Sequence, residues 1–408
     1  MTIEKYNEVL SVLAELIRGS EFEGHVFSVG GCERDRLMGR SIKDIDIVVD
    51  IPDGGIKIAN WLFAKGCLLK EPVVYEHYGT SMFHLKDIPD IELEAVQTRK
   101  EAYRDVNTRN PETAYGTILE DCTRRDFTYN AIYHNISTDE VVDFNGKSLQ
   151  DLKDNVLRTC GEPDIIFEED PLRILRGIRF VATLGSSISD ETLKGMWDKS
   201  ERLQIICPER IEEELTKMLT SNNAHVAVEL LIKTSAISFV FPQTKPEVVN
   251  TLKKVGSNDL CVNLAVISIY AMNWQNDLRR MRFPNSIIDR VMELRQLFSS
   301  FPLNPTMEWI RRFQYQCKNY TTFNDVMLIC KVFYPDETFI VEKITEKMRE
   351  EGYDMFGYKL PVDGKDVMEI KNLEPSPKVK FYLDLLLRAA LFNPKITKDE
   401  CIKILEYN

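Results

Sequence analysis

Residues 26–49, VFSVGGCERDRLMGRSIKDIDIVV, join two strand-like runs through a pair of glycines and a short helical stretch. The first run ends at Val29, Gly30 and Gly31 follow, and the second run begins near Asp44. Glycine lets the backbone approach a ligand closely, and the first turn of a helix presents free N–H groups to an anion such as a triphosphate. The glycine turn therefore predicts an anion-binding position.

Two aspartates, Asp44 and Asp46, lie two residues apart on the second strand, so their side chains point to the same face. Ile45 and Ile47 then point to the other face, into the core. Neighbouring carboxylates repel each other unless a cation lies between them, and Mg²⁺ prefers such oxygen ligands. Combined with the glycine turn, the pair favours a metal site. Either feature alone would fit a solvated strand edge with a turn.

A further acidic strand is predicted at residues 91–96, IELEAV. Glu92 and Glu94 share one face of this strand, and the apolar residues between them take the other face. Two interpretations stay open from the pattern alone. The acidic face could complete the metal site, or it could simply face solvent.

The stretch DCTRRDFTYNA, residues 121–131, predicts one helix that carries two arginines, two aspartates and an asparagine. Arginine makes forked contacts to phosphate, whereas Asp and Asn suit ribose hydroxyls. A solvated charged face explains the same composition.

A second arginine-rich helix is predicted within residues 167–184, with Pro171 at its first position and Asp170 as a possible N-cap. An apolar stripe covers one side, and the opposite side carries Arg173, Arg176 and Arg179. Asp170 and Arg173 can be neighbours at i,i+3. They could form an ion pair beside solvated arginines. Alternatively, their acceptor and forked donor could read the amine and ring nitrogen that cytosine and adenine share.

Composition limits the class of protein. The 408 residues exceed one ordinary core, which predicts several domains, and 44% hydrophobic with 28% charged residues is typical of a soluble globular chain. No apolar run approaches the ~20 residues of a membrane helix, and the N-terminal stretch resembles an amphipathic helix rather than a targeting peptide. Nine cysteines without a CxxC pair indicate reduced thiols, so we expect a cytoplasmic protein.

The net charge of −12 opposes nucleic-acid binding if it is spread evenly. A nucleic-acid-binding protein of this composition must therefore gather its basic side chains on one face. The candidates in the second half of the chain are Arg279, Arg280, Arg282, Arg311, Arg312, Lys378 and Lys380.

Six segments then stand in a recognisable order: GGCERD, DID, RRDFTYNA, GKSLQDL, EDPLRILR and PERIEEEL, across residues 29–215. In this order they resemble the motifs of the class II CCA tRNA nucleotidyltransferase and bacterial poly(A) polymerase family. The resemblance implies an α+β fold, with a polymerase-β-like head followed by all-helical neck, body and tail. We place the catalytic head at 1–145, the base-recognising neck at 146–240, the body at 241–350 and the tRNA-binding tail at 351–408.

The resemblance also implies roles for the head residues. Gly31 and Arg34 would hold the triphosphate. Asp44 and Asp46 would ligate Mg²⁺, and Glu94 would be the third acidic catalytic group.

The remaining nucleotide contacts are implied by the later motifs. Arg125 would contact the nucleotide and Asp126 its ribose, while Asp170 and Arg173 would pair with the incoming base. Supporting roles toward phosphate or helix position fall to Arg176 and Arg179.

One departure from the family pattern stands out. Glu33 replaces the usual apolar residue before Arg34, which adds a carboxylate beside a phosphate site.

The implied activity is the template-independent addition of CMP, CMP and AMP to the 3′ end of tRNA from CTP and ATP, with Mg²⁺ and release of pyrophosphate.

A poly(A) polymerase is one alternative, but the segment EPVVYEHYGTSMFHL lacks the basic cluster typical of those enzymes. CC-only and A-only enzymes are another, and the loop at Tyr103–Thr117 favours full CCA addition over them. A non-catalytic RNA-binding protein would not need intact Asp44 and Asp46. No membrane or protein partner is predicted.

Overall fold

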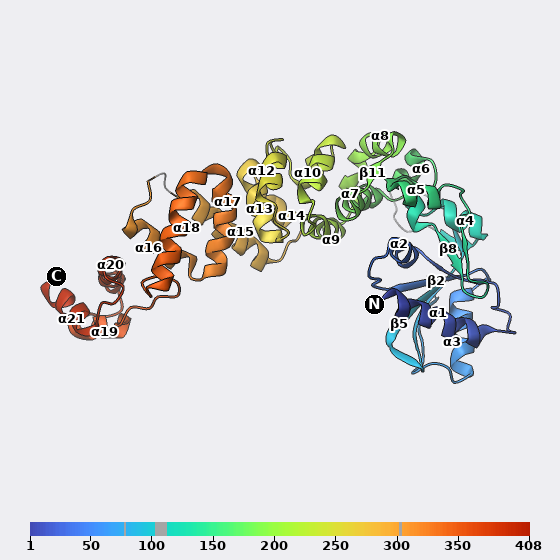
Figure 1. Ribbon diagram of the computed structural model, residues 1–408, viewed down its shortest axis with the longest axis horizontal. Coiled ribbons are helices and arrows are strands. Elements are labelled where there is room, and N and C mark those ends of the chain that lie inside the picture. The colour runs from blue at the N-terminus through green and yellow to red at the C-terminus, as the bar shows by residue number, and fades with distance from the viewer. Residues whose placement is uncertain (77–78, 103–111, 302–303) are drawn as a thin grey trace. The chain divides into compact units, whose positions relative to one another are not determined.

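The computed structural model describes residues 1–76, 79–102, 112–301 and 304–408. The chain divides into two compact units, Met1–Val240 and Phe241–Asn408 (Figure 1). The first unit contains the glycine turn and all the predicted site residues, and the second is helical over its described residues. No helix among the described residues has the length and apolar character needed to cross a membrane.

A mixed seven-stranded sheet organises the first half of unit 1. Strands β2 and β5 run parallel, whereas the other neighbouring pairs are antiparallel. The three strands predicted from sequence, two within 26–49 and one at 91–96, are all present. In spatial order the sheet contains β3 (Val73–Tyr75), β4 (Thr80–Leu85), β5 (Ile88–Gln97), β2 (Ile45–Val49), β1 (Val26–Val29), β8 (Tyr133–Asn135) and β9 (Glu140–Val142).

The two faces of the sheet differ in what they cover. Ile45 and Ile47 are fully buried, as predicted, and pack in one core with helices α1 (Ile3–Ile17) and α3 (Gly54–Ala64). Gly55 is required here, because a Cβ at this position would lie 2.5 Å from the Ala95 carbonyl oxygen of β5. Asp46 lies between the two isoleucines on β2, so it points to the opposite face.

The arginine-rich stretch 121–131 is not one helix, contrary to the sequence prediction. Helix α4 (Ile118–Thr123) ends before the arginines, a 3-10 turn η2 (Thr128–Asn130) follows, and β8 then begins. Phe127 between them has extended backbone and is fully buried. Burial of this ring outweighs the local helical tendency of the charged residues.

Helices dominate the rest of unit 1, as expected, although a two-stranded parallel pair, β10 (Val156–Leu157) and β11 (Ser187–Ile188), interrupts the all-helical prediction. Helix α7 packs against α6, α9 and α10 with its predicted apolar stripe buried. The helices are α5 (Ser148–Asp154), α6 (Pro163–Glu169), α7 (Leu172–Leu184), α8 (Asp190–Asp198), α9 (Pro208–Leu219), α10 (Ala224–Lys233) and α11 (Ile237–Val240), with the 3-10 helix η3 (Ser200–Ile205). A small hairpin, β6 (Arg99–Ala102) and β7 (Glu112–Tyr115), precedes α4.

Unit 2 is built from helices α12 to α21 in its described residues. The last three helices share a core of their own that includes Val367, Leu386 and Leu405. The finer division into neck, body and tail stays a prediction. The helices are α12 (Val248–Val255), α13 (Leu260–Tyr270), α14 (Trp274–Arg280), α15 (Asn285–Ser299), α16 (Met307–Cys317), α17 (Tyr320–Phe333), α18 (Pro335–Glu350), α19 (Gly364–Lys371), α20 (Pro377–Phe392) and α21 (Lys398–Tyr407).

Candidate functional site

The glycine turn joins β1 to helix α2 (Gly31–Leu37). Gly30 has φ 90° and ψ −137°, a conformation that glycine adopts without strain. A Cβ at Gly30 would lie 3.7 Å from Asp46 Oδ2 and 3.8 Å from Arg125 Nη1. The turn therefore brings backbone, a carboxylate and a guanidinium into one small region.

The three predicted acidic residues gather beside this turn. Asp46 of β2 pairs in register with Glu94 of β5, and Asp44 directly precedes β2. Burial and the charge of Glu94 raise the pKa of Asp46 to about 6, with Asp44 adding to the rise and Arg125 opposing it. Ionised Asp46 is thus destabilised by its acidic neighbours, which is the condition that a bound cation would relieve. Glu92, the other acidic residue on this face of β5, is exposed and lies 4.0 Å from His84.

The donor set fits a magnesium ion that is only partly coordinated by protein. Among the described residues, no three His, Cys, Asp or Glu side chains converge as a ready-made metal cage. Mg²⁺ commonly binds through one or two carboxylates and completes its octahedron with water and substrate phosphates. Asp44 and Asp46 supply such carboxylates next to the predicted phosphate position.

Arg125 is held in place by groups that the sequence analysis did not select. Its Nε and Nη2 bond Asp121 Oδ2 at 3.1 and 3.0 Å, and its Nε lies 3.0 Å from Tyr133 Oη. Asp121 is fully buried and also pairs with Arg124. Although burial opposes it, the charges of the two arginines keep the pKa of Asp121 well below its usual range. The spacing of Asp121, three and four residues before the arginines, could have indicated these pairs.

A chain of hydrogen bonds connects Arg34, the predicted triphosphate contact, to helix α7. Arg34 bonds Asp35 at 2.9 Å and Asn130 Oδ1 at 2.8 Å. Asn130 donates from Nδ2 to Asp126 Oδ1 at 3.1 Å, and Arg176 of α7 donates to Asp126 Oδ2 at 2.8 and 2.9 Å. Burial works against it, but Arg176 and Asn130 lower the pKa of Asp126 to about 2. The η2 turn therefore carries the contact between α2 and α7.

Three arginines surround one buried phenyl ring, Phe180 of α7. The guanidinium carbons of Arg179, Arg34 and Arg176 lie 4.1, 5.1 and 5.6 Å from the ring centroid. Arg179 also pairs with Glu214 of α9 at 2.6 Å. These arginines are partly or largely buried and bonded, so the alternative of freely solvated arginines on α7 is wrong.

Arg173 is bonded to backbone and to a different acid than its sequence spacing suggested. Its Nη1 lies 3.1 Å from both the Ile166 carbonyl and Glu169, and its Nη2 bonds the Arg124 carbonyl at 2.9 Å. Its acidic partner is Glu169, the last residue of α6, at i,i+4 rather than Asp170 at i,i+3.

Asp170 has its own partners. Its Oδ1 accepts from Leu172 N–H at 3.1 Å, and its Oδ2 pairs with Arg210 of α9 at 3.1 Å. The first bond is a capping interaction, although the helix itself starts at Leu172 with Pro171 in the capping position. The predicted Asp170–Arg173 pair is therefore replaced by Asp170–Arg210.

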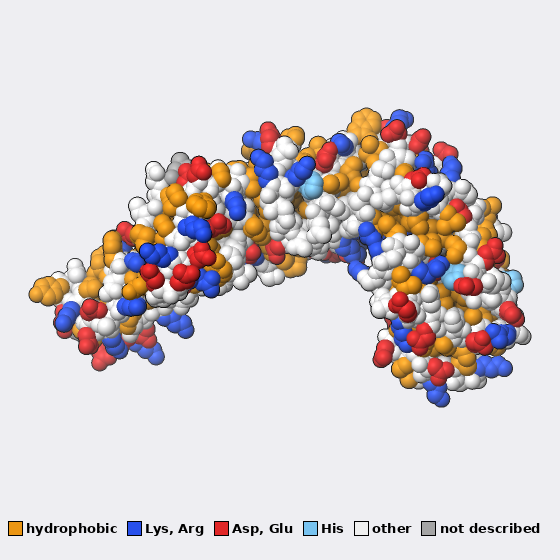
Figure 2. Space-filling view, viewed as in Figure 1, with side chains coloured by type: hydrophobic (Ala, Val, Ile, Leu, Met, Phe, Trp, Pro, Cys, Tyr) orange, Lys and Arg blue, Asp and Glu red, His pale blue; other side chains and the backbone are white. Residues whose placement is uncertain are grey.

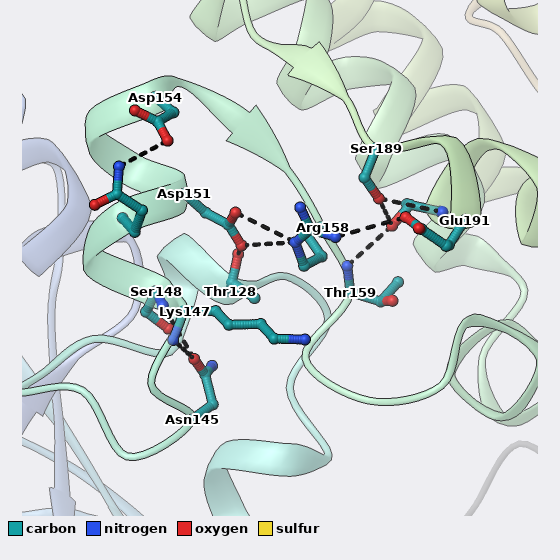
Figure 3. Close-up of polar contacts among 12 residues, drawn as sticks. Thr128, Asn145, Lys147, Ser148, Asp151, Asp154, Arg158, Thr159, Ser189 and Glu191 are labelled. Atoms are coloured by element: carbon teal, nitrogen blue, oxygen red, sulfur yellow. Dashed lines mark hydrogen bonds and ion pairs between the residues drawn. The ribbon is translucent and has the colours of Figure 1, made fainter.

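Asp151 connects the GKSLQDL segment to the η2 turn, a contact that the motif alone did not reveal. Its carboxylate accepts from Thr128 Oγ1 at 2.8 Å and from Arg158 Nε at 3.1 Å (Figure 3). Arg158 also reaches Glu191 of α8, at 3.5 Å. These contacts line a cavity of about 310 Å³ into which Lys147 extends. The carboxylate ties the η2 turn to α5.

Comparisons with known proteins identify the domains of the chain. Residues 26–158 match the poly A polymerase head domain, and residues 185–248 match the probable RNA and SrmB-binding site of polymerase A. The tRNA nucleotidyltransferase cca2 of Schizosaccharomyces pombe is 26% identical over 92% of this chain and 91% of its own length. The mitochondrial CCA tRNA nucleotidyltransferase of Candida glabrata is 34% identical over 52% of this chain and 42% of its own. The chain spans about half the length of most of the other curated relatives it matches.

The fold has a close counterpart among solved structures. The crystal structure of Bacillus stearothermophilus CCA-adding enzyme in complex with CTP superposes with a TM-score of 0.76, at 21% identity, over 98% of this chain and 97% of that one. The predicted architecture, a polymerase-β-like head followed by helices, is thereby confirmed. The chain belongs to the class II CCA tRNA nucleotidyltransferase and bacterial poly(A) polymerase family of nucleotidyltransferases.

Proposed function

We propose that this protein adds CMP, CMP and AMP to the 3′ end of tRNA without a template, by two-metal nucleotidyl transfer from CTP and ATP with release of pyrophosphate. The observation that carries the proposal is the meeting of Asp46 and Glu94 on adjacent parallel strands, beside the Gly30 turn and Arg125. Acidic and cationic groups therefore lie close to the same glycine, which supports binding of a metal-bound triphosphate there.

The chain's own residues would position the triphosphate. Gly30 and Gly31 keep the approach to the backbone open, and Arg34 and Arg125 provide guanidinium groups on either side. Arg34 now shares its donors between Asp35 and Asn130, so binding would draw some of them to phosphate oxygens. Because Arg125 is anchored by Asp121 and Tyr133, only its Nη1 end is left to face the nucleotide.

Asp44 and Asp46 would hold Mg²⁺, with Glu94 as the third acidic group. When bound, the metal ions would lower the pKa of the attacking 3′ hydroxyl and neutralise charge on the departing pyrophosphate. The carboxylates would orient the metal ions, and Asp126 would hold the ribose of the nucleotide.

Base selection is assigned to Asp170 and Arg173, which keep unused bonding capacity. A carboxylate has about four lone-pair sites and a guanidinium five N–H donors. The bonds described above use two of the first and three of the second. The remaining acceptor and donors match the amine and ring nitrogen shared by cytosine and adenine. Arg176 and Arg179, bonded to Asp126 and Glu214, would keep α7 in place.

The tRNA would be bound largely by the predicted body and tail, at 241–350 and 351–408. On the face shown in Figure 2, acidic and basic side chains are interspersed over both units. The basic surface required by the net charge of −12 is therefore expected on another face.

Poly(A) polymerase is the second candidate, because the matching head-domain family carries that name. The described strands β3 and β4, at 73–75 and 80–85, contain no arginine or lysine, which favours CCA addition. The loop Tyr103–Thr117, which favours full CCA over CC-only or A-only addition, lies outside the described residues over 103–111.

The cytoplasm is the compartment that we propose. All nine cysteines are free thiols, which agrees with a reducing environment. Two of the relatives are mitochondrial proteins by name, so fractionation of the host cell is the relevant test.

The test of the activity is incubation of purified protein with Mg²⁺ and a tRNA that ends before CCA. CTP alone should add two residues, and CTP with ATP should add exactly three and then stop. Continued growth on ATP would identify a poly(A) polymerase, and arrest after two residues with both nucleotides would identify a CC-only enzyme. Comparable use of UTP or GTP would contradict the proposed base selection.

A further inference from the structure

Glu33, the residue that departs from the family pattern, is a fully buried carboxylate with four side-chain partners. Its Oε1 accepts from Tyr6 Oη and Ser28 Oγ and lies 3.3 Å from His134 Nδ1. Its Oε2 accepts from Arg36 Nε at 2.8 Å. Burying a charge is costly unless it is paired and hydrogen-bonded, so each of these partners matters.

The partners come from four elements near the glycine turn, namely α1, β1, β8 and α2 itself. Ser28 is on β1, two residues before Gly30, and Glu33 lies in the first turn of α2, two residues after Gly31. The Ser28–Glu33 bond therefore links the strand before the glycine turn to the helix after it. Tyr6 adds helix α1 to the network, and His134 adds β8.

This network lies on the opposite side of the sheet from the acidic cluster. Ser28 pairs in register with Ile47 and with His134, and cross-strand neighbours share a face. Ile47 faces the α1 core, whereas Asp46 beside it faces away. Glu33 therefore has no direct contact with a nucleotide on the Asp46 side and can act only through the backbone of the turn.

We propose that Glu33 is a positioning residue that holds the Gly30–Gly31 turn from behind and thereby sets the geometry of the triphosphate-binding position. The inference rests on the proposed function, in which the nucleoside triphosphate occupies this turn. The next residue, Arg34, takes its direction from the same helical turn, and its backbone N–H bonds the Gly30 carbonyl at 3.2 Å. Any tilt of α2 that follows loss of the Glu33 contacts would therefore move Arg34 and the glycine backbone together.

The experiment compares Glu33→Gln with the wild type in the tRNA extension assay. Glutamine keeps an acceptor oxygen but loses the charge and presents an amide N–H₂ toward Arg36. We expect KM for CTP and ATP to rise about tenfold, the lower end of what removing outer-shell support costs at metal sites. KM for tRNA should stay unchanged, because the turn lies in the head.

Two milder variants still test the proposal if Glu33→Gln folds poorly. Ser28→Ala and Tyr6→Phe each remove one hydroxyl bond to the same oxygen, Glu33 Oε1. Each variant should raise KM for CTP by less than Glu33→Gln does, because the carboxylate keeps its other three partners. Because only Ser28 belongs to the turn, Ser28→Ala should raise KM for CTP more than Tyr6→Phe does.

Leu13→Ala is the control for stability alone. Leu13 is fully buried on α1 in the same core, and it has no part in the polar network. It should lower the melting temperature and leave KM for CTP unchanged. An unchanged KM in both Glu33→Gln and Ser28→Ala, or an equal rise in Leu13→Ala, would overturn the positioning role.

Direct CTP binding by calorimetry separates this inference from the proposed reaction. If the wild type extends no tRNA but binds CTP more tightly than Glu33→Gln, the positioning role stands and the CCA-adding proposal falls. If the wild type extends tRNA and the variants bind CTP equally well, the reverse holds. Absence of both CTP binding and extension in the wild type would contradict both.

Discussion

At the scale of single residues, the acidic cluster makes the sharpest prediction. Asp46→Asn should reduce nucleotide incorporation by at least about 10³-fold, because a metal ligand is lost. Removal of a single group that stabilises transition-state charge in other enzymes lowers the rate by a similar factor. The melting temperature should stay the same or rise, since the neutral side chain removes repulsion from Glu94 and Asp44. Extension assays and calorimetry on the same preparation measure the two effects.

Glu92→Gln is the matched control for Asp46→Asn. Glu92 is exposed on the same face of β5 as Glu94, yet it lies nearest His84. This variant should retain wild-type turnover. Retained turnover in Asp46→Asn itself would remove that residue from the metal site.

The role of Asp170 can be separated from its structural contacts. If it reads the base, Asp170→Ala should relax the C:A:U:G incorporation ratios, because each lost hydrogen bond costs about 1–3 kcal/mol in discrimination. Loss of the Leu172 cap and the Arg210 pair lowers stability instead, with caps worth about 0.5–2 kcal/mol.

Arg210→Ala provides the comparison, since it removes the ion pair and leaves the Asp170 carboxylate in place. It should lower the melting temperature and keep the incorporation ratios. Unaltered ratios in Asp170→Ala, together with a lowered melting point, would assign Asp170 a purely structural role.

At the scale of elements, the η2 turn joins α2 to α7 through Asp126, and this connection should be acid-sensitive. In the folded protein the pKa of Asp126 is about 2, below the ordinary value of 3.8, because of Arg176 and Asn130. The stability it contributes is fully present above pH 3.8 and is lost as the pH falls toward 2. Asp126→Asn should lower the melting temperature at neutral pH and flatten its decline in this acid window.

Asp198→Asn serves as the reference for that measurement. Asp198 pairs with Lys194 on the surface of α8 at 3.4 Å, where exposed pairs contribute little. Its pH profile should follow the wild type. An Asp126→Asn profile as steep as that of the wild type would contradict the connection.

At the scale of the whole molecule, tRNA affinity should fall steeply with salt. Each phosphate neutralised by Lys or Arg releases counterions, with a slope of about −0.9 per contact in log affinity against log salt for a duplex. Lys378→Gln combined with Lys380→Gln in α20 should reduce that slope and weaken binding. Filter binding over a range of salt concentrations measures both quantities, and a flat salt dependence would place the RNA contacts elsewhere.

Arg311 is a less suitable RNA contact than its charge suggested. Its Nη1 donates to the carbonyls of Leu391 and Phe392, both at 2.9 Å, at the C-terminal end of α20. A cation there satisfies carbonyls that lack helical partners and complements the helix dipole. Arg311→Gln should therefore lower stability more than it lowers the salt slope.

Local patterns were sufficient for the sheet and for the position of the glycine turn. Alternation of apolar and acidic residues determined which face Asp46 and Glu94 take, and the family motifs selected the residues that the fold gathers around the turn. The helix of 172–184 and its buried stripe followed from periodicity in the same way. These features depend on neighbours within a few residues, which is why the sequence alone determined them.

Partner choice was decided only by the tertiary structure. Arg173 binds backbone carbonyls and Glu169, Asp170 binds Arg210, and Asp121 holds both arginines of a stretch that is not one helix. Each of these pairings depends on which elements pack together. Sequence spacing alone allows several acidic residues as the partner of one arginine. Burial then selects among them, because a buried charge must find its partner wherever the packed chain places one.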